Sequence, residues 1–192
     1  MADDLNRALK QAAIRHLSRR EHTRDELRGK LRQTVQRQRA RAAREGALGD
    51  DSGASQAANQ ARSVEQPADA EQTWAAIESV LDDLGARGLQ SDARSAEVLL
   101  SARSAGWGER RLRVELQRRG VPKALAEEAL APLAGSELER ARVVWQRHFG
   151  QPPETAAEAA RQARYLAARG FAADVVRRLL RHPLPDDDDA AL

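Results

Sequence analysis

The pattern Leu-x-x-Arg-Gly followed by an apolar residue occurs three times in the chain, at residues 84–89, 116–121 and 166–171. Glycine adopts the left-handed backbone conformation that commonly ends an α-helix, and the residue after it folds back onto the leucine five positions earlier. The arginine then lies at the negative end of the helix dipole. The pattern therefore predicts three helices that end in the same way.

Other signals also favour helix. Ala, Leu and Arg dominate the chain, aromatic residues are only 3%, and such a composition forms strands poorly. Leucine and alanine recur every three or four positions, as in residues 5–20. The capping-box pattern Ser/Thr-x-x-Glu precedes helical stretches at Thr23, Ser136 and Thr155.

The order of long and short helices predicts an all-α fold of about nine helices in tandem three-helix repeats. Each repeat is too small to bury its apolar faces well, so we expect the repeats to stack into an elongated, curved, right-handed or solenoid-like arrangement. The first repeat contains residues 1–35 (two helices) and 71–90 (its third helix). The second contains residues 91–134, and the third contains residues 135–182.

Two segments lack the apolar residues that a packed core needs. Residues 36–70 are rich in Ala, Gln, Gly, Ser, Asp and Arg, and are expected to be a flexible low-complexity insertion whose start could extend the preceding helix. Residues 183–192 contain four consecutive aspartates and are expected to be a disordered acidic tail.

The charge is distributed unevenly along the chain. The net charge is only +3, yet residues 1–45 carry 13 basic and 6 acidic side chains, whereas residues 46–100 carry 3 and 10. A basic surface of this kind contacts nucleic acid or an acidic protein, or simply solvates helix faces.

The sequence offers little to catalysis. It has no cysteine, no phosphate-binding glycine loop and no nucleophile motif. The four histidines lack ligand spacing and are interpreted as surface or helix-end residues: they are His16, His22, His148 and His182. We therefore expect no enzyme activity, no cofactor and no metal. No apolar run could cross a bilayer and no signal peptide is recognisable, so we expect a cytoplasmic protein.

Basic side chains on helix faces are the candidate contacts with a partner or DNA, because guanidinium groups bind carboxylates and phosphates alike. On the helix 109–119 they flank Val114, which lies roughly opposite the core-facing leucines. The candidate set is Arg15, Arg19, Arg20, Arg24, Arg28, Lys30, Arg110, Arg111, Arg113, Arg118, Arg161 and Arg164.

A second set is expected to hold the fold together, as core side chains or helix-end residues. It consists of Leu27, Leu31, Trp107, Leu112, Leu116, Gly120, Val121, Leu166, Gly170 and Phe171.

Residues 107–121, WGERRLRVELQRRGV, resemble the central signature of the RecX family: an aromatic-Gly pair, a basic-apolar pair, an acid-Leu pair, then a basic residue before Gly and an aliphatic. Residues 13–31 are similar to the opening segment of the family and residues 165–171 to its closing segment. The chain departs from the family at residues 88–89 and 95–96, and in its long insertion.

The resemblance implies a non-catalytic regulator of the RecA recombinase in homologous recombination, DNA repair and the SOS response. Family members bind the RecA–single-stranded-DNA filament, bridge its protomers, and suppress its growth, ATP hydrolysis, strand exchange and coprotease activity. Some also bind DNA directly. We expect a monomer with no membrane contact.

The alternative is a helical DNA-binding module or transcription regulator, because short helices joined by tight turns can mimic a helix-turn-helix. A recognition helix should carry base-reading side chains near its start. In the helix 109–119 only Arg110 and Arg111 qualify.

Overall fold

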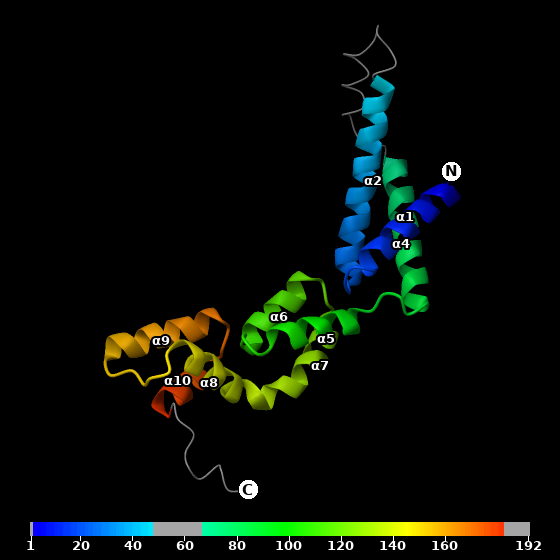
Figure 1. Ribbon diagram of the computed structural model, residues 1–192. Coiled ribbons are helices and arrows are strands. Elements are labelled where there is room, and N and C mark those ends of the chain that lie inside the picture. Colours follow the sequence, from blue (N-terminus) through cyan, green and yellow to red (C-terminus); the bar gives the residue numbers. More distant parts are fainter. Residues whose placement is uncertain (1, 48–66, 183–192) are drawn as a thin grey trace. The chain divides into compact units, whose positions relative to one another are not determined.

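The computed structural model describes residues 2–47 and 67–182 (Figure 1). Within these two ranges it contains nine α-helices, one 3-10 helix and no strand, so the predicted all-α class is confirmed. The chain divides into two compact units, residues 1–91 and 92–192.

The first unit is a group of three helices that all contact one another. These helices are α1 (Ala2–Leu17), α2 (Arg24–Ala47) and α4 (Pro67–Ala86). The apolar stripes read from the sequence meet in its core, where Leu9, Leu27, Leu31, Ile77, Leu81 and Leu84 are almost completely buried.

Helix α2 is longer than the pattern of large apolar residues indicates. It continues to Ala47, and α4 begins at Pro67, so the expected insertion 36–70 overlaps helix at both ends. Residues 36–47 are mostly Arg, Ala and Gln, whose intrinsic propensity favours helix without burial. Proline suits the first turn of α4 because its missing N–H has no partner there in any helix. Residues 48–66 and the acidic tail 183–192 lie outside the described residues.

The second unit contains two further three-helix groups. The first of them consists of α5 (Asp92–Arg103), α6 (Glu109–Arg118) and α7 (Lys123–Leu130). A 3-10 helix, η1 (Ala131–Ser136), leads directly into the second group, which consists of α8 (Glu137–His148), α9 (Ala156–Ala168) and α10 (Ala173–Arg181).

Each three-helix group has a buried cluster of its own. Leu112, Leu116 and Leu130 are central in one, and Trp145, Leu166 and Leu179 in the other. This differs from the expectation that a single group buries its apolar faces poorly. Because the third helix closes over the first two, each group forms a core without help from its neighbour.

All three predicted helix ends are confirmed. Gly88, Gly120 and Gly170 have φ angles of 67°, 77° and 86°. The N–H of the residue after each glycine donates to the carbonyl five residues earlier, at 2.9, 3.0 and 3.3 Å respectively, and each glycine N–H donates to the carbonyl three residues earlier. These are the two bonds of the Schellman motif. The apolar partner is buried at Val121 and Phe171, whereas Leu89 remains 48% exposed.

Two of the three expected capping boxes have their N-terminal bond. The backbone N–H of Glu26 donates to Thr23 Oγ1 at 3.1 Å, and that of Glu158 donates to Thr155 Oγ1 at 3.2 Å. The prediction was wrong at Ser136, whose hydroxyl donates to the carbonyl of Leu133 instead. Ser136 closes the 3-10 helix, and α8 continues directly from it, so no free helix start exists there to cap.

Inside the second unit the two groups meet through backbone. The N–H of Gly108 donates to the carbonyl of Arg169 at 2.9 Å. A Cβ on Gly108 would lie 2.3 Å from the Gly170 carbonyl, and one on Gly170 would lie 2.4 Å from the Cβ of Arg111. Only glycine at both positions permits this approach.

Two side chains from α8 complete the junction. Glu137 is buried, and its Oε1 accepts the N–H of Glu109, the first residue of α6, at 3.0 Å, and the N–H of Ala172, just before α10, at 3.4 Å. Arg140 Nη1 donates to the carbonyls of Ser104 and Trp107 at 3.1 and 2.8 Å. A carboxylate at two helix starts satisfies N–H groups that have no partner within the helix, so Glu137 fixes α6 relative to α10.

Candidate partner-binding surface

The residues expected to hold the fold together lie in the buried cores or at helix ends. Most are buried in the three cores, and Trp107 is half-buried against the core of α5–α7. Gly120 and Gly170 have the left-handed backbone.

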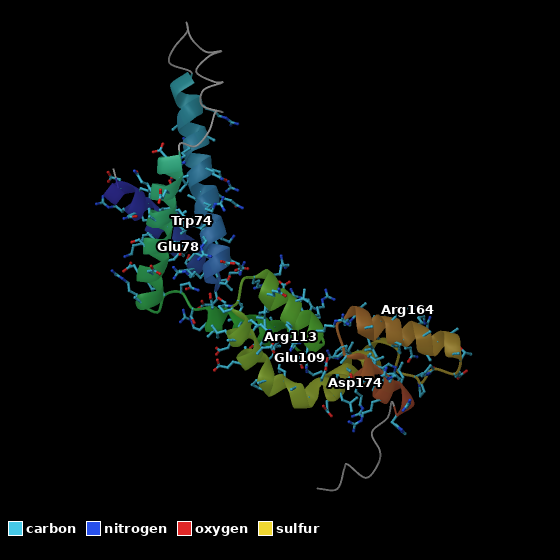
Figure 2. All side chains as sticks on the ribbon, turned by 180° about the vertical axis from the view of Figure 1, so that it is seen from behind. Trp74, Glu78, Glu109, Arg113, Arg164 and Asp174 are labelled. Atoms are coloured by element: carbon cyan, nitrogen blue, oxygen red, sulfur yellow. The ribbon has the colours of Figure 1, made fainter. Side chains whose placement is uncertain are left out.

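Basic side chains on α2 are already paired with acids on α4. Arg24 Nη2 lies 2.7 Å from both Glu78 Oε2 and Asp82 Oδ1, and Arg28 Nε lies 2.5 Å from Glu78 Oε1 (Figure 2 labels Glu78). Arg28 also contacts Asp25. The hydrogen bonds to Glu78 raise the pKa of both arginines, and the bond from Arg28 is the main cause that lowers the pKa of Glu78. These charges hold α2 against α4.

Three other cations of the first unit gather around His16. Arg15, Arg19 and Lys30 each repel a proton on this ring, and together with burial, the largest cause, they lower its pKa. Among the side chains that the structure describes, no carboxylate pairs with any of these three cations. Arg20 differs, because its Nη1 lies 3.0 Å from Glu26 Oε2.

Helix α6 carries two paired arginines, one on each flank, and one open face. Arg113 binds Glu109 at 2.7 Å and Glu127 at 2.9 Å, and the bonds to Glu127 are the main cause that raises its pKa (Figure 2 labels Arg113 and Glu109). Arg118 binds Glu115 at 2.8 Å and, as the main cause, lowers the pKa of that carboxyl to about 2.

The open face of α6 consists of Arg110 and Val114, one turn apart. Val114 is 59% exposed, as expected for a position opposite the core. In the part of the chain that the structure describes, Arg110 has no charged partner. Arg111 lies on the other flank, with its guanidinium carbon 4.3 Å from the Trp107 ring centre, and it donates to the carbonyl of Ala168 at 3.4 Å.

The two candidates on α9 are exposed. Arg161 lies with its guanidinium carbon 5.9 Å from the Phe149 ring centre. Arg164, labelled in Figure 2, has no ion-pair partner within the described ranges. The predicted site residues thus separate into charges used inside the fold and charges open to a partner. The open set is Arg15, Arg19, Lys30, Arg110, Arg161 and Arg164.

Sequence reasoning missed a stack of rings beside α9. The ring centres of His148 and Tyr165 lie 3.8 Å apart with 5° between their planes, and the Arg169 guanidinium carbon lies 3.6 Å from the Tyr165 centre. The spacing of Tyr165 and Arg169, four residues apart on one helix, could have indicated their contact. No local signal connects His148 to them, because it lies on another helix.

His22, interpreted as a surface or helix-end residue, lies just before the start of α2 and is buried there. This side chain is 3% exposed, its Nδ1 lies 3.1 Å from Glu26 Oε2, and its ring centre lies 5.9 Å from that of His16. Burial is the largest cause that lowers the pKa of both rings from 6.5, and Arg20 adds to it at His22.

Acidification from pH 7.5 to 5.5 should therefore destabilise the first unit. The unfolded chain binds protons near pH 6.5, whereas the folded histidines bind them only at lower pH. The free energy that the two neutral histidines contribute to folding is fully present above pH 6.5 and is lost as the pH falls below that value. Urea unfolding at a series of pH values measures the effect.

The double variant His16→Gln with His22→Gln is the control for this window, because the lowered pKa of Glu78 places its own contribution at more acidic pH. The urea midpoint of the double variant should vary less between pH 7.5 and 5.5 than that of the unaltered protein. Equal pH dependence of the two proteins would contradict the assignment.

The described residues contain no group of three or more His, Cys, Asp or Glu side chains that could hold a metal ion. Within the same residues, no helix combines the length and the apolar character that a membrane span requires. A groove of about 360 Å³ between α2 and α4 is lined by Val35, Thr73, Trp74 and Ile77, among others.

Comparison with known proteins points to one family. Residues 91–130 match the model of the second three-helix domain of RecX, and residues 136–180 match that of the third. A regulatory protein RecX of Ralstonia nicotianae is 34% identical over 184 residues, which are 95% of this chain and 93% of the relative. The RecX of Leptothrix cholodnii is 51% identical over 107 residues, which are 56% of this chain and 68% of that protein.

The fold is also similar to a solved structure. The crystal structure of RecX from Lactobacillus salivarius aligns with a TM-score of 0.65, over 95% of this chain and 98% of that chain. Sequence identity in this alignment is 16%, so it supports the fold alone.

Proposed function

Because the chain belongs to the RecX family of regulatory proteins, we propose that it regulates the RecA recombinase by binding the RecA–single-stranded-DNA filament. Binding suppresses the filament's growth, ATP hydrolysis, strand exchange and coprotease activity. The protein acts in the cytoplasm as a monomer, without catalysis, in homologous recombination, DNA repair and the SOS response. The observation that carries the proposal is the nearly full-length similarity to a regulatory protein RecX.

We further propose that the three-helix groups within residues 1–90, 91–134 and 135–182 are the working units of the protein. The separate buried cluster in each group supports this division. A regulator built from such units can contact several protomers of a filament at once, and linked contacts raise the overall affinity without any single strong contact.

The open face of α6 is the surface that we assign to the filament. An exposed valine beside an arginine without a carboxylate partner is a favourable contact pair, because apolar burial and a guanidinium contribute most at interface centres. The complementary surface is an apolar patch bordered by carboxylates. Arg15, Arg19, Lys30, Arg161 and Arg164 are the further proposed contacts, and salt should weaken binding through them.

The N-terminus of α6 argues against a recognition helix for DNA. The carboxylate of Glu137 already accepts the N–H of Glu109 there, and Glu109 itself is acidic. Two carboxylates at this end repel phosphate and occupy the positive end of the helix dipole. This observation favours the filament regulator over the transcription regulator.

The test is a titration of the protein into RecA assembled on single-stranded DNA, with ATP hydrolysis as the readout and electron microscopy of filament length in parallel. We expect falling hydrolysis and shorter filaments, and no ATP hydrolysis by the protein alone. Unchanged hydrolysis over a full titration with folded protein would overturn the proposal.

A further inference from the structure

Four side chains at the end of α8 and along α9 form a compact aromatic and cationic cluster. His148 and Tyr165 are stacked in parallel, and the guanidinium of Arg169 lies over Tyr165. Phe149 meets both rings nearly at right angles, at 81° to His148 and 77° to Tyr165. Phe149 is therefore beside the column and not on its axis.

The order within the column follows from sterics. The centres of the His148 ring and the Arg169 guanidinium lie 3.8 and 3.6 Å from the centre of Tyr165. Two stacked groups at these distances would overlap on one face of the ring, so they occupy opposite faces. Tyr165 is the middle layer, and His148 and Arg169 are the ends.

The His148 end of the column is open. His148 is exposed, and within the described residues no ring or cation stacks on its second face. The core of this group does not need the ring, because Trp145 is fully buried and its Nε1 donates to Gln162 at 2.7 Å. An exposed ring held in a fixed plane is a surface on which another planar group can stack.

Two further arginines neighbour the cluster. Arg147 precedes His148 and is exposed, and Arg161 lies over Phe149. A ligand that combines a planar ring with negative charge fits such a surface, and unpaired nucleotides have both.

We propose that the column Arg169–Tyr165–His148 is a stacking site for an unpaired base of single-stranded nucleic acid. The base stacks on the open face of His148, and the neighbouring arginines contact the phosphates. The new element is the location and mode of the contact, a base stacked between α8 and α9, in addition to the proposed regulation of RecA. It can be tested without the recombinase, so its failure and that of the proposed function are distinguishable.

The experiment measures fluorescence anisotropy of a labelled 15-nucleotide oligothymidylate with the full-length protein. The matched ligand is an abasic strand of the same length and charge. We expect His148→Ala to weaken binding of oligothymidylate about tenfold, the usual size of one base–aromatic contact, and to leave binding of the abasic strand unchanged. His148→Phe, which retains a ring without the ionisable group, should bind oligothymidylate like the unaltered protein.

The control variant is Gln146→Ala, an exposed position on α8 two residues away and so on a different face of the helix. This variant should bind both oligothymidylate and the abasic strand with the affinity of the unaltered protein. If His148→Ala weakens the binding of both strands equally, the stacking site is overturned, because the base would then make no contribution to affinity. Unchanged affinity of His148→Ala, or no binding of oligothymidylate by the unaltered protein, would overturn it as well.

Discussion

Replacing Gly170 with alanine should lower the free energy of unfolding of the second unit by about 3 kcal/mol. The residue has a φ of 86°, which alanine rarely adopts, and the added Cβ would lie 2.4 Å from the Cβ and 2.5 Å from the backbone nitrogen of Arg111. The first turn of α6 would have to move to relieve this overlap. Urea and thermal unfolding followed by circular dichroism should show a melting temperature lower by about 10 °C or more.

Substitutions at two other glycines separate the cost of the left-handed backbone conformation from the cost of the steric overlap. Gly88 has a φ of 67°, and an added methyl group there would have no atom within 4 Å, so Gly88→Ala reports the backbone cost alone. Gly106 has open space and no positive φ, so Gly106→Ala should be nearly neutral. If Gly170→Ala is no more destabilising than Gly88→Ala, the close approach between the two groups has no energetic weight.

The double variant Arg110→Glu with Val114→Asp should raise the concentration needed for half-inhibition of RecA ATP hydrolysis at least about tenfold, by the loss of one well-buried contact pair. The variant reverses the charge at Arg110 and places a carboxylate at Val114, on a face of α6 that does not pack against the rest of the fold. Its unfolding midpoint should match that of the unaltered protein. Arg113 is left in place, because its bonds to Glu109 and Glu127 support α6.

An exposed valine on α8 provides the control. Val143 is 44% exposed and is not part of either proposed contact surface, so Val143→Asp makes the same valine-to-aspartate change away from α6. We expect this variant to inhibit RecA nearly normally. If the α6 variant inhibits RecA fully, or if both variants lose inhibition equally, α6 is not the contact surface.

Much of the fold could be predicted from the sequence because its signals act over one or two turns. The Leu-x-x-Arg-Gly ends involve residues at most five apart, and the structure has their bonds at all three positions. The exposed position of Val114 likewise follows from helical periodicity. Ser136 shows the limit of such signals, since a 3-10 helix joined to α8 removes the helix start that its pattern indicates.

The candidate site could be predicted only in part. Residue type identified the arginines, but their partners lie far along the chain: Arg28 pairs with Glu78, 50 residues away. The same distance in sequence hid the stack of His148 on Tyr165. Which cations are open to a partner was therefore not visible in the pattern.

By itself, the sequence determined the helical class, the three Leu-x-x-Arg-Gly helix ends and the apolar stripes, because these depend on backbone preferences and contacts between near neighbours. Only the tertiary structure decided which charges are neutralised inside the fold, that Glu137 caps two helices, and that Gly108 and Gly170 bring two backbones together. These features depend on the distance between residues that are remote in the chain, and only the packing of the helices sets that distance.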